Sequence, residues 1–181
     1  IQQRRRLHLH YLRQGETEPV ERVVEPASLL FSEYYFYLSA YLVKQQEDGR
    51  MARQYDYPAL FRVDRIVRYV SLKEHFPQLY ADRFQEGEFR KRVQFMYPGQ
   101  LEQIRIRYTG RSVSAVLDRL PTARILEKGE DGTVLEAEVY GTGILMWLLS
   151  QGTQVEILAP AHLRETMREN LRAMLARYET V

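Results

Sequence analysis

Apolar and polar positions alternate in the first part of the chain, which is the pattern of half-buried β-strands. The clearest strand is predicted over residues 35–43 (YFYLSAYLV), because aromatic and branched side chains dominate it. Further strands are predicted at residues 7–13, 20–25, 27–31 and 60–70, with a stop at Pro26 and a polar loop over residues 44–57. Five short strands joined by turns predict a small barrel or a strongly bent sheet, since closure removes exposed edges.

The spacing of apolar residues is different in the second half of the chain. Residues 103–108 alternate as a strand, whereas Val113, Val116, Leu117 and Leu120 follow the i, i+3, i+4, i+7 spacing of a helix. A hairpin follows at residues 124–140, then a buried helix at 144–149, a strand at 155–157 and a striped helix at 163–178. The order β-α-β-β-α-β matches the ferredoxin-like plan, with an extra C-terminal helix. We therefore expect an α+β protein with a barrel at 1–80, a connector at 81–98 and a ferredoxin-like domain at 99–181.

Composition changes this picture in only a few respects. The net charge of +2 does not indicate a generic polyanion binder, but 22 of the 26 basic residues are arginine, whose planar fork grips phosphate. A general preference for arginine codons explains the count equally well. The chain has no cysteine and no apolar run near the roughly 20 residues of a membrane span, so we expect a cytoplasmic protein that does not contact the membrane. Because it begins at Ile1, we expect an N-terminal portion to be missing.

Enzyme motifs are not evident in the sequence. It contains neither a phosphate-binding glycine loop nor a nucleophile elbow, and Glu136 and Glu138 are expected to be solvated on one outward strand face. His8 and His10, spaced i, i+2, could ligate a metal, but no third ligand is evident. The sequence therefore predicts neither catalysis nor a metal or cofactor, and both histidines are expected at the surface.

Several segments resemble the WYL domain family, which is named for a Trp-Tyr-Leu triplet. The triplet is Phe36-Tyr37-Leu38 here, and residues 61–66 (FRVDRI) resemble the second family signature. Tyr11 and residues 22–26 (RVVEP) are similar to the opening strands of the family. Residues 115–121 (AVLDRLP) and 147–152 (WLLSQG) resemble the C-terminal extension, called WCX, that follows many WYL domains. The resemblance thus covers nearly the whole chain.

This resemblance implies an Sm-like or SH3-like barrel in a bacterial transcription regulator. Such regulators usually carry an N-terminal helix-turn-helix that binds operator DNA, and they work as homodimers. The implied effector is of nucleic-acid type, either single-stranded DNA or a nucleotide. We further expect a homodimer because residues 144–149 and the final helix carry more apolar positions than so small a domain can bury alone.

The ligand-binding candidates are Arg62, Arg65, Tyr37 and His10. The arginines would grip phosphates beside Tyr37, on which a base could stack. Residues three apart point to opposite faces of a regular strand, so the two arginines share a pocket only if a bend separates them. The alternative is a structural ion pair, either of Arg65 with a glutamate or of Arg62 with an aspartate. Most tyrosines between residues 34 and 69 are expected to be structural.

Two other functions are compatible with the sequence. The chain could be a purely structural dimerisation module, in which case replacing Arg62 and Arg65 would leave an attached regulator functional. It could instead be an Sm-like RNA-binding domain, which would require exposed aromatic side chains on the sheet.

Overall fold

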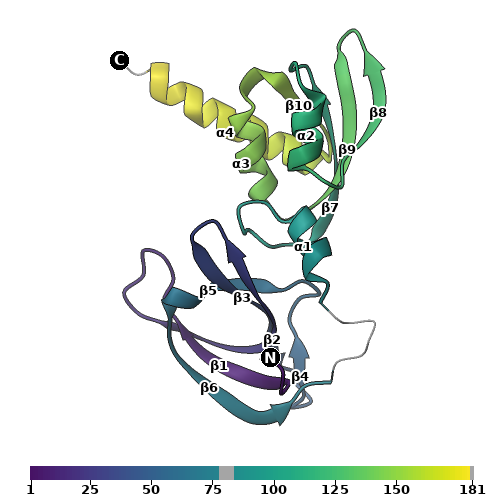
Figure 1. Ribbon diagram of the computed structural model, residues 1–181. Helices are drawn as coiled ribbons and strands as arrows, with labels where there is room; N and C mark the ends of the chain where they lie inside the picture. The colour runs from purple at the N-terminus through teal and green to yellow at the C-terminus, as the bar shows by residue number, and fades with distance from the viewer. Residues whose placement is uncertain (78–83, 180–181) are drawn as a thin grey trace. The chain divides into compact units, whose positions relative to one another are not determined.

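The structure is a computed structural model that describes residues 1–77 and 84–179. The chain divides into two compact units (Figure 1). Unit 1 comprises Ile1–Glu86 and Pro98–Gln100, and unit 2 comprises Gly87–Tyr97 and Leu101–Val181. The domain limits expected from the sequence stay a prediction, and residues 81–83 of the expected connector lie outside the described residues.

Unit 1 is a small β-barrel. Its strands are β1 (Arg5–Tyr11), β2 (Val20–Ser32), β3 (Tyr35–Gln45), β4 (Met51–Arg53), β5 (Ala59–Arg62) and β6 (Ile66–His75). They follow the order β4-β3-β2-β1-β6, and β5 also pairs with β3. Because β5 and β6 are consecutive, one stretch of chain pairs with both β3 and β1 and closes the sheet. The expected Sm-like or SH3-like barrel is confirmed.

Three expectations for the barrel strands were wrong. Pro26 does not end a strand, because β2 runs through it with a register shift between Pro26 and Ser28. Such a bulge tolerates a residue without an N–H. The polar segment 44–57 is not all loop, since β4 pairs with β3 there. Finally, residues 60–70 are not one strand: a 3-10 turn, η1 (Val63–Arg65), separates β5 from β6, and β6 continues to His75.

The core of the barrel is formed by alternate residues of its strands. Leu9, Val24, Leu38, Ala40 and Phe61 are buried together. Because neighbouring residues of a strand point to opposite faces, Leu9 in the core leaves the side chains on either side of it outside. Burial of these apolar groups fixes the register of β1, β3 and β5, the strands that carry the ligand-binding candidates His10, Tyr37 and Arg62.

Unit 2 has the ferredoxin-like βαββαβ order, as expected. Its elements after the short helix α1 (Glu86–Arg92) are β7 (Leu101–Tyr108), α2 (Val113–Arg119), β8 (Arg124–Gly129), β9 (Gly132–Tyr140), α3 (Gly143–Ser150), the 3-10 turn η3 (Gly152–Gln154), β10 (Val155–Ala159) and α4 (Ala161–Glu179). The sheet is antiparallel with strand order β10-β7-β9-β8, which is the ferredoxin-like arrangement. The extra C-terminal helix α4 is confirmed.

The core of unit 2 lies between its sheet and its helices. Ile104 and Ile106 of β7 pack with Leu135 of β9, and Ile144 and Leu148 of α3 belong to the same cluster. Trp147 is buried as well. Most apolar side chains of α3 are therefore buried within unit 2 itself, as expected for this helix, whereas Leu171, Met174 and Leu175 of α4 stay exposed. Among the residues that the structure describes, no helix is both long and apolar enough to cross a membrane.

Candidate functional site

The η1 turn is the bend that the two candidate arginines require. Arg62 is the last residue of β5, and Arg65 is the last residue of η1. Arg62 pairs with Tyr37 across β5 and β3, so their side chains lie on the same face. The turn changes the direction of the chain before Arg65, so strand alternation no longer places the two arginines on opposite faces.

Arg62 is held in place by two neighbours. Its Nε donates to Asp64 Oδ1 at 3.1 Å and its Nη2 donates to Asp64 Oδ2 at 2.6 Å. The guanidinium carbon also lies 3.4 Å from the centre of the Tyr35 ring, a cation–π contact. The hydrogen bonds from Arg62 hold the pKa of Asp64 below its ordinary value. The Arg62–aspartate pair that the sequence offered as the structural alternative is therefore present. It also fixes the orientation of the Arg62 guanidinium.

Arg65 and Tyr37 belong to the same cluster. Arg65 Nη2 donates to Gln14 Oε1 at 3.2 Å. Burial raises the pKa of Tyr37, while the positive charges of Arg62 and Arg65 both act to lower it. Tyr37 is the register partner of Arg62, and Arg65 follows Asp64 directly in η1, so these residues belong to one region of the barrel. We name Arg62, Arg65, Tyr37 and Tyr35 the arginine–tyrosine cluster; the sequence did not single out Tyr35.

Among the residues that the structure describes, the side chain of His10 contacts His8 and Glu21 and not this cluster. Its Nδ1 lies 3.8 Å from Glu21 Oε1, and its neighbour His8 places Nε2 3.1 Å from Glu21 Oε2. Both histidines are half-buried on the outer face of the barrel, as expected for residues that flank the buried Leu9. The assignment of His10 to the ligand-binding site stays a prediction, because its contacts in the described part of the chain are with other residues.

An apolar pocket of about 360 Å³ opens in the barrel wall. Its lining residues are Ile1, Leu7, Leu9, Leu29, Leu38, Val63, Ile66 and Tyr69. Val63 lies between Arg62 and Arg65 in the η1 region, so the pocket adjoins the segment that carries the arginines. An apolar pocket with a few polar groups at its edge is the usual form of a small-molecule site.

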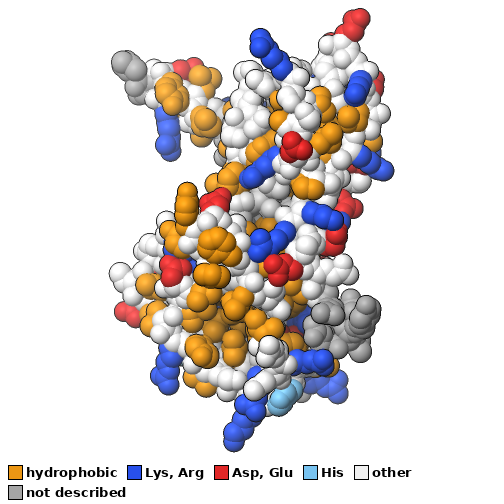
Figure 2. All heavy atoms as spheres, in the orientation of Figure 1, with side chains coloured by type: hydrophobic (Ala, Val, Ile, Leu, Met, Phe, Trp, Pro, Cys, Tyr) orange, Lys and Arg blue, Asp and Glu red, His pale blue; other side chains and the backbone are white. Residues whose placement is uncertain are grey.

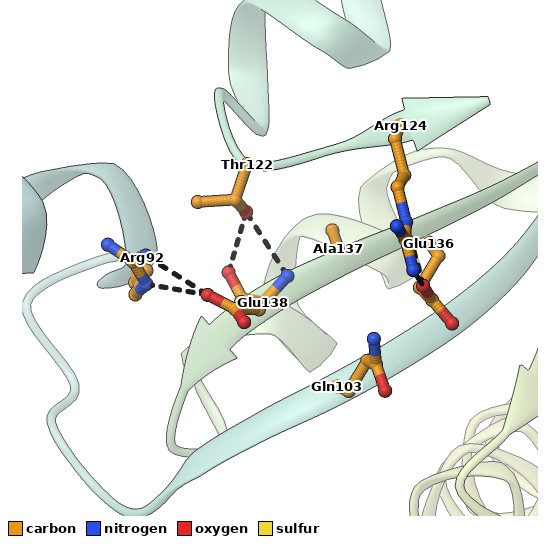
Figure 3. Close-up of a pocket in the computed structure, with 7 residues that line it drawn as sticks. All are labelled: Arg92, Gln103, Thr122, Arg124, Glu136, Ala137 and Glu138. Atoms are coloured by element: carbon orange, nitrogen blue, oxygen red, sulfur yellow. Dashed lines mark hydrogen bonds and ion pairs between the residues drawn. The ribbon is translucent and has the colours of Figure 1, made fainter.

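Unit 2 carries a second, highly charged pocket, also of about 360 Å³ (Figure 3). Glu136 is only 3% exposed, because Arg105 on β7 and Arg124 on β8 cover it from both sides. Their hydrogen bonds lower the pKa of Glu136. Arg92 Nη2 lies 3.0 Å from Glu138 Oε2 in the same pocket.

The expectation that Glu136 and Glu138 are both simply solvated was therefore wrong. Both carboxylates are paired with arginines of neighbouring elements, and Thr122 Oγ1 donates to the backbone carbonyl of Glu138 at 2.7 Å. Alternation correctly placed the two glutamates on the face opposite the core, but it did not show the arginines beside them. These mutual ion pairs neutralise the charges that line the pocket. We therefore interpret the pocket as a structural part of unit 2 and not as a ligand-binding site.

Two domain families match the chain. The WYL domain matches residues 1–70, and the WCX domain matches residues 100–175. The chain belongs to the WYL-domain family. WYL and WCX domains are parts of regulatory proteins, which are generally not enzymes, so this chain is a WYL-type regulatory region.

The chain is also similar to two solved structures. One is proteasome accessory factor B/C (PafBC) of Arthrobacter aurescens, at 22% identity and a TM-score of 0.41, over 99% of this chain and 26% of that one. The other is described as a CRISPR Cas-related protein, at 18% identity and a TM-score of 0.56, over 97% of this chain and 48% of that one. The second likeness supports the fold alone. This chain spans about a quarter and about half of their respective lengths. No curated protein matches it.

Proposed function

We propose that this chain is the ligand-sensing and dimerisation region of a bacterial WYL-type transcription regulator. Its effector is of nucleic-acid type, either single-stranded DNA or a nucleotide, and it binds the barrel at the arginine–tyrosine cluster. The observation that carries this proposal is the η1 turn, which bends the chain between Arg62, the register partner of Tyr37, and Arg65.

The chemistry of the cluster fits a phosphate-bearing ligand. A guanidinium offers paired N–H donors that match two phosphate oxygens, and Arg62 is already oriented by Tyr35. Aromatic side chains beside the cluster are exposed: Tyr34, in the turn before β3, is 85% exposed, and Tyr35 is 39% exposed. Bases of an unpaired strand stack on such rings. Figure 2 shows apolar side chains gathered over the strands of unit 1.

Effector binding would act by favouring one of two arrangements of the dimer. An N-terminal helix-turn-helix would then meet operator DNA differently in the two states, which is how a coupling between distinct sites arises. The effector must contact the two states differently for this to occur. The aromatic side chains and the η1 turn are the parts of the barrel that such a difference would involve.

A binding titration tests the proposal directly. Fluorescence anisotropy of short labelled single-stranded DNA, duplex DNA and RNA, each titrated with the chain, is expected to show preference for single-stranded DNA. Because phosphate contacts release counterions, the logarithm of the affinity should fall linearly with the logarithm of salt concentration. Affinity that does not change between low and high salt would contradict phosphate recognition. A preference for RNA would instead favour the Sm-like RNA-binding alternative, which the exposed aromatics permit.

We also propose that α4 mediates a homodimer. Leu171 and Leu175 are 51% and 57% exposed, and Met174 and Tyr178 lie on the same helical stripe and are exposed as well. A second copy of the helix would cover this stripe in a symmetric contact. Sedimentation is expected to show a dimer that Leu171→Arg with Leu175→Arg converts to monomer. Arg168→Ala, which removes a surface ion pair of the same helix, should leave the dimer intact. A wild-type chain that sediments only as monomer at high concentration would contradict this interface.

The rival function is a structural dimerisation module without an effector. The ion pair between Arg62 and Asp64, which contains two hydrogen bonds, favours this function. Under that reading the arginine only stiffens the η1 turn, and substitutions at the cluster would change stability without changing the affinity for any nucleic acid.

A further inference from the structure

His8, His10 and Glu21 form a compact cluster on the outer face of the barrel, apart from the arginine–tyrosine cluster. One nitrogen of each ring and one carboxylate oxygen all lie within 4.8 Å of one another. From these positions we propose that the cluster is a binding site for a divalent transition-metal ion of the zinc type.

The strand register explains why these three residues meet. Leu9 is buried in the barrel core, so His8 and His10 on either side of it share the outer face. Glu21 of β2 is the register partner of His10, and Val23 is that of His8, so the carboxylate reaches both rings. The third ligand, which the sequence pattern did not reveal, thus comes from the neighbouring strand across a hairpin.

The distances match the size of a zinc site. Zinc binds imidazole nitrogen at about 2.0–2.1 Å and carboxylate oxygen at about 2.0–2.2 Å, usually with tetrahedral geometry, which places neighbouring donor atoms roughly 3.4 Å apart. Here the carboxylate oxygens lie 3.1 Å from His8 Nε2 and 3.8 Å from His10 Nδ1. Small side-chain rotations are therefore enough to place all three donors around one ion. Two histidines and one carboxylate leave the fourth position for water or an anion.

The scaffold is suited to hold these ligands. β1 is paired on both sides, with β2 and with β6, so the backbone under the two histidines is fixed. Glu21 has the more exposed side chain and is free to adjust. Arg68 of β6, the register partner of His10 on its other side, opposes a cation. Metal binding would replace the hydrogen bond between His8 Nε2 and Glu21 Oε2 and release its proton.

Calorimetric titration with zinc sulfate is expected to show one ion bound per chain. His8→Ala, His10→Ala and Glu21→Gln should each weaken binding by about 100-fold or more, since even residues that only support a ligand change affinity 10- to 100-fold. Arg68→Gln should tighten it. The matched control is His162→Ala: His162 Nε2 also lies 3.1 Å from a carboxylate, that of Glu102, but the described residues around that pair provide no third ligand.

Cobalt gives a second readout that a merely structural role would not affect. Co²⁺ bound by the wild-type chain is expected to show the intense visible absorption of a four-coordinate ion, and the three ligand variants should lack it. Circular dichroism would confirm that each variant is folded. Zinc binding that is absent at protein-equimolar metal, or that is equally strong in all three ligand variants, would overturn the proposal. Because the arginine–tyrosine cluster contains none of His8, His10 and Glu21, these results do not depend on nucleic-acid binding by that cluster.

Discussion

Replacing Glu25 with alanine is expected to lower the free energy of unfolding of the barrel by about 3–5 kcal/mol. Glu25 is only 5% exposed, and its two carboxylate oxygens accept from different arginines. Arg6 Nη2 donates at 3.0 Å and Arg53 Nε donates at 2.8 Å. Without the carboxylate, two largely covered cations lose their counter-charge while their desolvation remains, which is the most destabilising way to break a buried ion pair.

Hydrogen exchange in increasing urea would measure this effect on the amides of β1, β2 and β3 directly. Asp48→Ala is the matched control, because Asp48 also pairs with an arginine, Arg50, but both side chains are exposed. Surface pairs of that kind contribute roughly 0–1 kcal/mol. Equal effects of the two substitutions would mean that the buried triad does not stabilise the barrel.

The barrel strands and the ferredoxin-like order were predictable because both follow from local alternation and helical periodicity. The division of residues 60–70 was not predictable, because LFRVDRIVRYV alternates well enough for one strand. The break arises from closure: β5 must pair with β3 while β6 pairs with β1, and the chain turns at η1 to do both. That requirement is a property of the whole barrel and leaves no local signal.

In the candidate site, too, some features could be predicted from the sequence and others could not. The sequence indicated Arg62, Arg65 and Tyr37 as candidates and showed that the two arginines could share a pocket only if a bend separated them, and the structure contains such a bend at η1. It did not find Tyr35, which lies under the Arg62 guanidinium. Nor did it find Glu21, which is distant in sequence from His8 and meets it only through strand pairing. Contacts across strands depend on register, and register becomes known only when the pairing is.

The Arg62–Asp64 pair has consequences for how an effector would bind. A phosphate must compete with Asp64 for the same guanidinium, because the carboxylate occupies the fork with two hydrogen bonds. We expect such a surface to be selective: a single weak anion would not displace the aspartate, whereas a ligand that also stacks on an aromatic ring and reaches Arg65 would. Such competition would favour a nucleotide or a single-stranded segment over free phosphate.

The double substitution of Arg62 and Arg65 by alanine is therefore expected to weaken single-stranded DNA binding by at least about 100-fold, since each hydrogen-bonded charge contributes roughly 10- to 100-fold. The salt dependence should fall at the same time, because fewer phosphates are neutralised. Asp64→Asn is the sharpest control: it keeps the shape of the turn, removes the competing charge from Arg62, and is expected to tighten binding by about 10-fold. Anisotropy titrations of the wild type, the double arginine variant and Asp64→Asn distinguish an effector-binding barrel from a purely structural dimerisation module. If neither substitution changes the affinity, the arginines are structural and the barrel does not use them to sense nucleic acid.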